Sequence, residues 1–487
     1  MTIPARGLDR AALLERLDRF RAQDTDVQAG RAFGYIYTSG LEADAIAREV
    51  YARFLDPNAL DPSVYPSALN LEREVVAIAA AHLGGDERTV GSFTSGGTES
   101  IMLAVKAARD LARATRPEVR TPELLLPTTG HAAFHKAADY LGLKIVQVDV
   151  DPETFTPAPE AYERAIGPNT VLLAASAPSY AHGVIDPIAD IAEVAAARGL
   201  PFHVDACVGG FLLPYFRRLG DAIPEFDLRV PGVTSISMDL HKYGFCPKGA
   251  SIVVFRDRAL RRHHVYACSE WTGYTVVNPN VQSSRSAGPV AAAWAVLHHI
   301  GDEGYLGLAR ELRTAARRLV EGVRAIRGLR VPGRPAFAMA AISSDEIDVF
   351  QLQDEMKDRG WYLQPQLSYR GSPANLHVSI LPANAHRVDE MLADLAAAVE
   401  AVRARGVSTE GPRQLAAMLA SIPESEWTPE TLEGLLGGGG FEIPDRMADV
   451  HAILDAVPRS ITKRILSEFM NELYSPRAAT PNLVGAP

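Results

Sequence analysis

Hydrophobic positions along the chain follow two different periods, and the change between them predicts where helices and strands lie. In residues 8–21 apolar side chains recur at helical spacing, and residues 71–83 repeat this amphipathic pattern. From about residue 90 to residue 260, short apolar runs alternate with helical stretches such as 100–114 and 188–198. The predicted strands are Glu123–Leu126, Lys144–Val148, Thr170–Ala175, Phe202–Val204, Ser235–Met238 and Ser251–Phe255. This alternation predicts an α/β fold with a mainly parallel sheet covered by helices.

The pattern changes again near residue 290. Residues 290–326 predict a long helix with a charged break at 302–304, and a smaller α+β unit follows. The expected elements of this smaller unit are strands at Leu329–Val331, Glu346–Phe350 and Leu376–Ile380 and a helix at Arg387–Arg403.

The tail after residue 404 contains Gly437–Gly440, which predicts a hinge or loop, and helical patterning resumes at 449–473. We therefore expect four parts. They are an N-terminal helical segment (1–65), a large domain (66–304), a small C-terminal α+β domain (305–404) and a C-terminal helical extension (405–487).

Composition narrows the class of protein. The 487 residues include 49 Lys and Arg against 59 Asp and Glu, a net charge of −10, which argues against nucleic acid as a partner. The three cysteines, Cys207, Cys246 and Cys268, fit neither a disulfide scaffold nor a zinc motif, and reduced thiols indicate a cytoplasmic protein. Charged residues interrupt the first thirty positions and every long apolar run, so we expect neither a signal peptide nor a transmembrane segment.

A glycine-rich stretch, Thr94-Ser-Gly-Gly97-Thr98-Glu-Ser, stands directly before a predicted helix. The glycines allow close approach of the backbone, and the first N–H groups of the helix point at a bound anion, so Gly97 and Thr98 are candidates for holding a phosphate. The alternative is that Thr98 merely caps the helix.

Two more chemical candidates follow predicted strands. Asp205 ends an apolar strand in His203-Val-Asp205-Ala-Cys207, where ligands bind in open α/β sheets, although it is also a plausible helix cap. Lys242 follows His241 after the next strand and is a candidate for a Schiff-base lysine, against the alternative of a surface lysine. We expect burial and neighbouring cations to lower the pKa of Lys242 and make it nucleophilic.

Together, a phosphate cradle, a carboxylate for a pyridinium nitrogen and a lysine for an aldehyde are what pyridoxal 5'-phosphate requires. His131 lies between the first two in sequence and is a candidate for stacking on the cofactor ring. His131 and His135 have the spacing of a metal pair, but no third ligand accompanies them, so we expect no metal.

Beyond these residues, the chain resembles the pyridoxal-phosphate-dependent sphingosine-1-phosphate lyases, in the fold-type-I group that includes the glutamate and aromatic amino-acid decarboxylases. The resemblance covers about residues 30–400. It rests on Ser95–Ile101, His131–Phe134, Ala175–Pro178, His182–Pro187, His203–Phe211, Ser235–Gly244, Cys246–Gly249 and Ser284-Arg285.

The resemblance implies a role for each matching position. It implies that Lys242 forms the Schiff base, Asp205 pairs with the pyridinium nitrogen and His131 stacks on the ring. It implies that the cofactor phosphate is held by Gly97, Thr98 and His241, with Ser284 contributed by the neighbouring subunit of a homodimer.

The resemblance also implies a subsite for a substrate phosphate. Lys248 is similar to a lysine that binds this group, and Tyr37 in Gly34-Tyr-Ile-Tyr37 is similar to a tyrosine that contacts it, with Tyr35 as a competitor. Tyr474 is a further candidate for a lid. One departure concerns Asp61, which stands where the lyases commonly carry histidine, and a carboxylate there is unfavourable beside an anionic substrate.

The implied reaction is retro-aldol cleavage of a phosphorylated sphingoid base to a long-chain aldehyde and phosphoethanolamine. The membrane anchor of eukaryotic lyases has no counterpart in the sequence, so a soluble bacterial-type form is expected. Two alternatives stay open: an amino-acid decarboxylase on the same scaffold, and a non-catalytic binding protein that keeps the fold.

Overall fold

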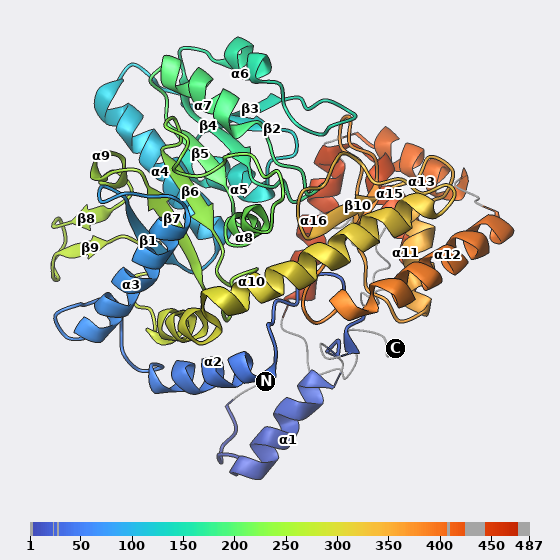
Figure 1. Ribbon diagram of the computed structural model, residues 1–487, viewed down its shortest axis with the longest axis horizontal. Helices are drawn as coiled ribbons and strands as arrows, with labels where there is room; N and C mark the ends of the chain where they lie inside the picture. Colours follow the sequence, from blue (N-terminus) through green and yellow to red (C-terminus); the bar gives the residue numbers. More distant parts are fainter. Residues whose placement is uncertain (1–2, 23, 27–28, 407–409, 424–443, 476–487) are drawn as a thin grey trace.

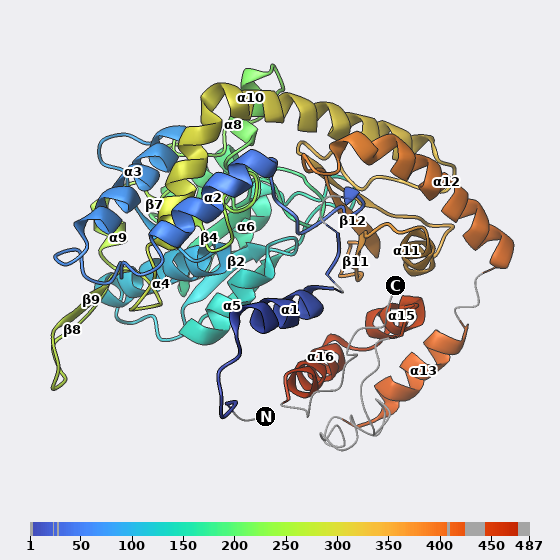
Figure 2. The same cartoon turned by 90° about the horizontal axis from the view of Figure 1, so that it is seen from below.

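The computed structural model describes residues 3–22, 24–26, 29–406, 410–423 and 444–475 (Figures 1 and 2). A seven-stranded sheet forms its centre, in the order β1-β7-β6-β5-β4-β2-β3. Strands β2 to β6 are parallel, and β7 runs antiparallel to both β6 and β1. The strands are β1 (Val90–Thr94), β2 (Glu123–Pro127), β3 (Lys144–Val148), β4 (Thr170–Ser176), β5 (Phe202–Asp205), β6 (Ser235–Met238) and β7 (Ser251–Phe255).

Helices cover both faces of this sheet, as the alternation of strands and helices predicts. Alternate residues of one strand enter different cores: Leu124 and Leu126 of β2 pack with α4 and α5, whereas Leu125 faces the core that includes α7. The helices of this domain are α2 (Leu41–Arg53), α3 (Pro66–His82), α4 (Gly97–Thr115), α5 (Ala132–Leu141), α6 (Pro159–Ala165), α7 (Ile188–Ala197), α8 (Leu213–Arg218) and α9 (Arg258–Arg261). The predicted α/β class is confirmed, and all six predicted strands are present.

Two features of this domain were absent from the predictions. Strand β1 contains Gly91 and Ser92, so it lacks the apolar run of its neighbours. Strands β8 (Tyr266–Cys268) and β9 (Val276–Asn278) form a hairpin that projects from the body in both views (Figures 1 and 2).

Helix α10 (Gly288–Ala325) connects the large sheet to the smaller unit and passes through the predicted boundary at residues 304 and 305 (Figure 1). Its break lies at Gly301, whose φ of 63° and ψ of 173° are not helical. Glycine adopts this left-handed φ without steric cost, and the charged residues that follow remain helical.

The smaller unit contains an antiparallel sheet in the order β10-β12-β11 and two helices. Its elements are β10 (Met339–Ile342), α11 (Val349–Asp358), β11 (Gln364–Gln366), β12 (Asn375–Ser379), the short η2 (Ala385–Arg387) and α12 (Val388–Arg405). The predicted strand at Glu346–Phe350 is wrong, because Asp348 caps α11 by accepting hydrogen bonds from the N–H groups of Phe350 (2.8 Å) and Gln351 (3.1 Å). The predicted strand at Leu329–Val331 reduces to one bridge between Arg330 and Ser343.

The C-terminal extension is helical where the structure describes it, with α13 (Glu410–Ser421), α15 (Ala448–Ala456) and α16 (Arg459–Leu473). It docks on the smaller unit through Asp354, whose buried carboxylate accepts from the N–H groups of Met447 (2.9 Å) and Ala448 (3.0 Å). The predicted hinge at Gly437–Gly440 lies outside the described residues.

The first helix, α1 (Arg10–Arg21), has no buried residue. Within the part of the chain that the structure describes, no helix has the length and apolar character needed to cross a membrane.

Candidate active site

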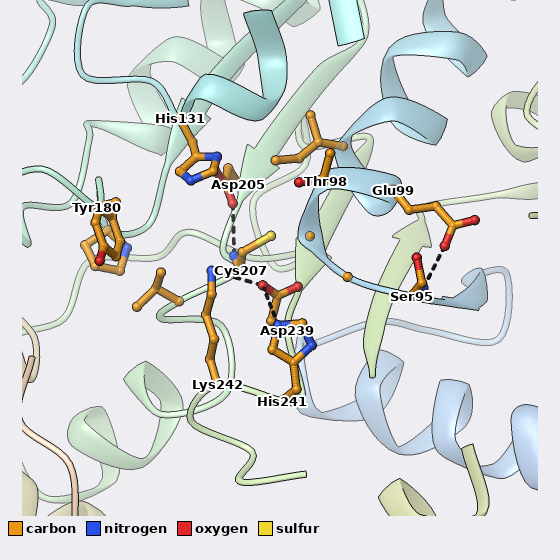
Figure 3. A pocket seen from close by; sticks show the side chains of 15 residues that line it. Ser95, Thr98, Glu99, His131, Tyr180, Asp205, Cys207, Asp239, His241 and Lys242 are labelled. Atoms are coloured by element: carbon orange, nitrogen blue, oxygen red, sulfur yellow. Dashed lines mark hydrogen bonds and ion pairs between the residues drawn. The ribbon is translucent and has the colours of Figure 1, made fainter. Parts of the chain in front are cut away.

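A cavity of about 400 Å³ lies where the carboxyl ends of β5 and β6 meet the first turn of α4 (Figure 3). Asp205 is the last residue of β5, and Asp239 directly follows β6. Parallel neighbouring strands end at the same edge of a sheet, which is why segments far apart in sequence meet here. The lining brings together six residues that the sequence singled out: Gly97, Thr98, His131, Asp205, His241 and Lys242.

The glycine-rich stretch forms a close-fitting loop at the start of α4. A Cβ atom at Gly97 would lie 2.7 Å from Sγ of Cys207 and 2.9 Å from the carboxylate of Asp239, so no larger residue fits without displacement. The helix is capped by Gly96, not by Thr98, so the alternative role of Thr98 as the cap is wrong. Thr98 lies in the first turn, and its exposed side chain faces the cavity (Figure 3).

A buried glutamate, Glu99, holds this loop in place through two hydrogen bonds to backbone N–H groups. One carboxylate oxygen accepts a hydrogen bond from the N–H of Ser95 (2.6 Å), and the other accepts from the N–H of Val281 (2.7 Å). The loop is therefore tied to the segment that follows the β8–β9 hairpin.

Lys242 is half-buried, and it pairs with a carboxylate that the sequence analysis did not single out. Its Nζ lies 3.0 Å from Oδ2 of Asp239, and Nε2 of His241 lies 3.7 Å from the same oxygen. Burial lowers the pKa of Lys242, but the Asp239 carboxylate outweighs burial, so the pKa is raised above its ordinary value. The expectation of a lowered pKa is therefore wrong for the cofactor-free chain, because the nearest charge is an anion.

Asp205 is 7% exposed and opens onto the cavity. Its Oδ1 accepts hydrogen bonds from the N–H of Cys207 (3.0 Å) and from the hydroxyl of Ser237 (3.4 Å). Its other oxygen is available to a cationic donor within the cavity, because both of these bonds involve Oδ1.

His131 caps α5, since its Nδ1 accepts a hydrogen bond from the N–H of Ala133 (3.1 Å). This bond fixes the ring and places the proton of the neutral imidazole on Nε2. Burial lowers the pKa of His131, against the opposing effect of Asp205. At neutral pH the cavity is thus walled by a neutral aromatic ring.

Tyr180 also lines this cavity and was missed in the sequence. Its hydroxyl donates to Oε1 of Gln364 (2.6 Å), and its ring stacks on His377 with centroids 4.2 Å apart. Both supports come from the smaller unit, on β11 and β12. The residues near Tyr180 in the sequence do not indicate its place in the cavity, because Gln364 and His377, which hold it, lie far along the chain.

A second cavity, of about 440 Å³, is lined by Tyr35, Tyr37 and Lys248 together with α2. The Nζ of Lys248 lies 4.6 Å from the ring centroid of Tyr37, within range of a cation–π interaction. Burial lowers the pKa of Lys248 to about 8, and the positive charge of Lys242 adds to this effect. Of the two tyrosines, Tyr35 is 56% exposed and packs on Tyr362, whereas Tyr37 contacts Lys248.

Three residues named from the sequence lie outside both of these cavities. Ser284 is exposed, with the side-chain amide of Asn58 3.5 Å from its hydroxyl, and Tyr474 is 76% exposed. Asp61 stabilises its own turn, because Oδ1 accepts from the N–H (2.8 Å) and the hydroxyl (2.6 Å) of Ser63. These bonds lower the pKa of Asp61.

The residues of the first cavity fit pyridoxal phosphate. The glycine loop and first turn of α4 offer N–H groups and the Thr98 hydroxyl, and a Cβ at Gly96 would lie 3.6 Å from the His241 ring. His241 Nδ1 and Asp239 Oδ1 are buried without a hydrogen-bond partner in the described chain, which indicates that a ligand completes the site. Among the described residues no cluster of His, Cys, Asp or Glu side chains is arranged to hold a metal ion.

Comparisons with known proteins agree with this geometry. Residues 24–336 match the Pyridoxal-dependent decarboxylase conserved domain, and residues 413–472 match the "Pyridoxal-dependent enzyme, C-terminal putative HTH domain". The sphingosine-1-phosphate lyase of Arabidopsis thaliana is 38% identical over 439 residues, covering 88% of this chain and 79% of the relative. That of Dictyostelium discoideum is 33% identical, covering 98% and 82%.

A solved structure of the sphingosine-1-phosphate lyase of Burkholderia pseudomallei is 35% identical, with a TM-score of 0.79 over 87% of this chain and 98% of that one. The Lactobacillus brevis glutamate decarboxylase shares the fold, with a TM-score of 0.72 at 19% identity. The fold and the site thus define a fold-type-I enzyme that uses pyridoxal phosphate. The chain belongs to the pyridoxal-dependent decarboxylase family, in the branch of the sphingosine-1-phosphate lyases.

Proposed function

We propose that the protein cleaves a phosphorylated sphingoid base of the sphingosine 1-phosphate type into a long-chain aldehyde and phosphoethanolamine. One observation carries the proposal: Tyr37 lines the second cavity with its ring 4.6 Å from Nζ of Lys248, and it interacts electrostatically with Lys242 of the first cavity. A substrate whose amine reaches Lys242 can therefore place a phosphate beside Lys248. An amino-acid decarboxylase, whose substrate has no phosphate to bind, has no comparable need for the Lys248 cation in the second cavity.

When bound, pyridoxal phosphate supplies an acceptor for the electron pair released as the carbon–carbon bond breaks. We assign to Asp205 the role of keeping the ring nitrogen protonated, and to His131 that of packing against the ring face. Gly97, Thr98 and His241 would hold the cofactor phosphate through N–H, hydroxyl and imidazole donors.

Lys242 would hold the cofactor through its Nζ, and the same amine would transfer protons during the reaction. The base that takes the proton of the substrate hydroxyl is one of three groups: Lys242, Tyr37 or a cofactor phosphate oxygen. Lys248 and Tyr37 would orient the substrate through charge-assisted bonds to its phosphate.

The activity is tested by incubating the purified holoenzyme with sphingosine 1-phosphate and measuring aldehyde and phosphoethanolamine by mass spectrometry. The K242A variant provides the control. If neither product forms while the cofactor is bound, the proposed substrate is wrong, and carbon dioxide release from a panel of amino acids then tests the decarboxylase alternative.

We further propose a cytoplasmic homodimer with shared sites, in which Ser284 reaches the cofactor phosphate of the neighbouring subunit. Support comes from the exposure of Ser284 and from its position outside both cavities of its own chain. Mixing S284A and K242A subunits tests the arrangement, because a shared site gives one intact site in each mixed dimer. Activity that does not rise above the two separate variants would contradict it.

A further inference from the structure

We propose that Arg48 supplies a second cation to the Lys248 cavity and makes this cavity selective for a phosphomonoester headgroup. The inference rests on the proposed function only for the name of the substrate. Its physical basis is the placement and charge of one face of helix α2.

Helix α2 forms a wall of the second cavity. Ala43 and Ala47 are buried, and Ala47 lines the cavity together with three larger residues, Asp44, Arg48 and Tyr51. These three residues are separated by four and three positions, so they form one stripe along the helix. The stripe places the Arg48 side chain at the same cavity as Lys248 and Tyr37.

Arg48 is available to a ligand. Within the described residues its guanidinium has no ion pair and no side-chain hydrogen bond, whereas Arg53, one turn further along α2, pairs with Glu49. The nearest candidate partner along the helix, Asp44, instead accepts a hydrogen bond from the hydroxyl of Thr38 (2.8 Å). An exposed arginine at the wall of a cavity can therefore turn to an anion without breaking a native pair.

Arg48 decides the net charge of the side chains that line the cavity. The charged side chains that line it are Lys248, Arg48 and Asp44, and the other titratable groups are three tyrosines and the buried Cys246. Without Arg48, the carboxylate of Asp44 would cancel the ammonium of Lys248. With Arg48, the lining carries a net charge of +1, which suits a phosphate.

The two cations also differ in how they respond to pH. The ammonium of Lys248, with a pKa of about 8, loses its charge in mildly alkaline solution. A guanidinium keeps its charge and binds two phosphate oxygens at once. Above pH 8 Arg48 therefore still offsets the carboxylate of Asp44, whereas without Arg48 the charged side chains of the lining would leave a net charge of −1.

The test measures binding of phosphoethanolamine to the holoenzyme by calorimetry at pH 7.5 and pH 9, with ethanolamine as the probe that lacks phosphate. We expect R48A to weaken phosphoethanolamine binding about tenfold or more, as for loss of a hydrogen-bonded charge, with the larger loss at pH 9. R48K should recover part of the affinity. The matched control is R53A, on the same helix, which should stay within about twofold of wild type.

Cofactor absorbance and thermal unfolding of each variant separate binding from folding. Equal affinities for R48A and R53A, both folded, would overturn the role of Arg48. A wild-type protein that binds phosphoethanolamine through Arg48 but does not cleave sphingosine 1-phosphate would uphold this inference and refute the proposed function. In steady-state kinetics, the R48A effect should be on KM rather than on kcat.

Discussion

Lys242 and Lys248 are six residues apart in the chain, yet the structure gives them opposite electrostatic environments. Lys242 is half-buried and Lys248 is more exposed, and partial loss of hydration by itself lowers the pKa of a lysine. At Lys242 the carboxylate of Asp239, 3.0 Å away, reverses that effect and holds the amine as a cation. At Lys248 no carboxylate pairs with the amine among the described residues, and its pKa falls to about 8. The neighbouring carboxylate thus sets the direction of the pKa shift at Lys242, whereas loss of hydration sets it at Lys248.

The largest effect is expected from removing the first lysine. K242A should lower the rate of aldehyde release by roughly 10³-fold or more, because both cofactor attachment and proton transfer depend on this amine. The measurement is single-turnover product formation together with the visible absorbance of the cofactor. K144A, at a surface lysine of β3, is the matched control and should leave both unchanged.

The pairing of Lys242 is tested by D239N. Without the carboxylate, burial dominates, so the pKa of Lys242 should fall below its present value. In the cofactor-free protein, the pH dependence of Lys242 modification by an amine reagent should shift to lower pH. An unchanged profile would show that Asp239 does not control this lysine. Because the variant leaves a buried charge without its partner, we also expect the free energy of unfolding to decrease by about 3 kcal/mol.

The second lysine predicts a pH effect on substrate binding. Below pH 8 Lys248 is protonated and attracts phosphate, and above pH 8 it becomes neutral, so KM for the phosphorylated substrate should rise as the pH passes about 8. K248Q should raise KM about tenfold at pH 7 and flatten this rise. A K248Q profile as steep as that of wild type would assign the titration to another group.

The smallest effect is expected at the tyrosine that interacts with both lysines. Y37F keeps the ring against Lys248 and removes only the hydroxyl, so we expect kcat/KM to fall about threefold to tenfold, as for loss of one hydrogen bond. Y35F, at the more exposed tyrosine of the same cavity, should change it less than twofold. A larger loss for Y35F would exchange the roles of the two residues.

Much of the fold was predictable because its strands are buried on both faces. Apolar runs such as Ser251–Phe255 leave little ambiguity, and they match the observed strands. The prediction failed where local chemistry outweighed the apolar pattern, as at Asp348, whose capping bonds begin a helix within the predicted strand. Strand β1 was missed because its glycine and serine lack strand propensity, and pairing with β7 supplies what the sequence does not.

The residues of the candidate site also fall into those that the sequence indicated and those that it did not. Gly97, Asp205 and Lys242 could be named together because a phosphate cradle, a carboxylate and a lysine are what pyridoxal phosphate requires. Asp239 carried a usable signal, a carboxylate at the end of β6 three residues before Lys242, but its role was not inferred. Tyr180 gave no local signal at all, because Gln364 and His377 hold it in place from the smaller unit.

The sequence by itself determined the class of fold, the cofactor chemistry and the order of the residues that serve it. These follow from periodicity and from side-chain chemistry at strand ends, which are local properties. Only the tertiary structure decided the pKa of Lys242, the wall formed by Tyr180 and the position of Arg48 at the second cavity. Those depend on distances between charges and on burial, and both are set by contacts between segments that the chain keeps far apart.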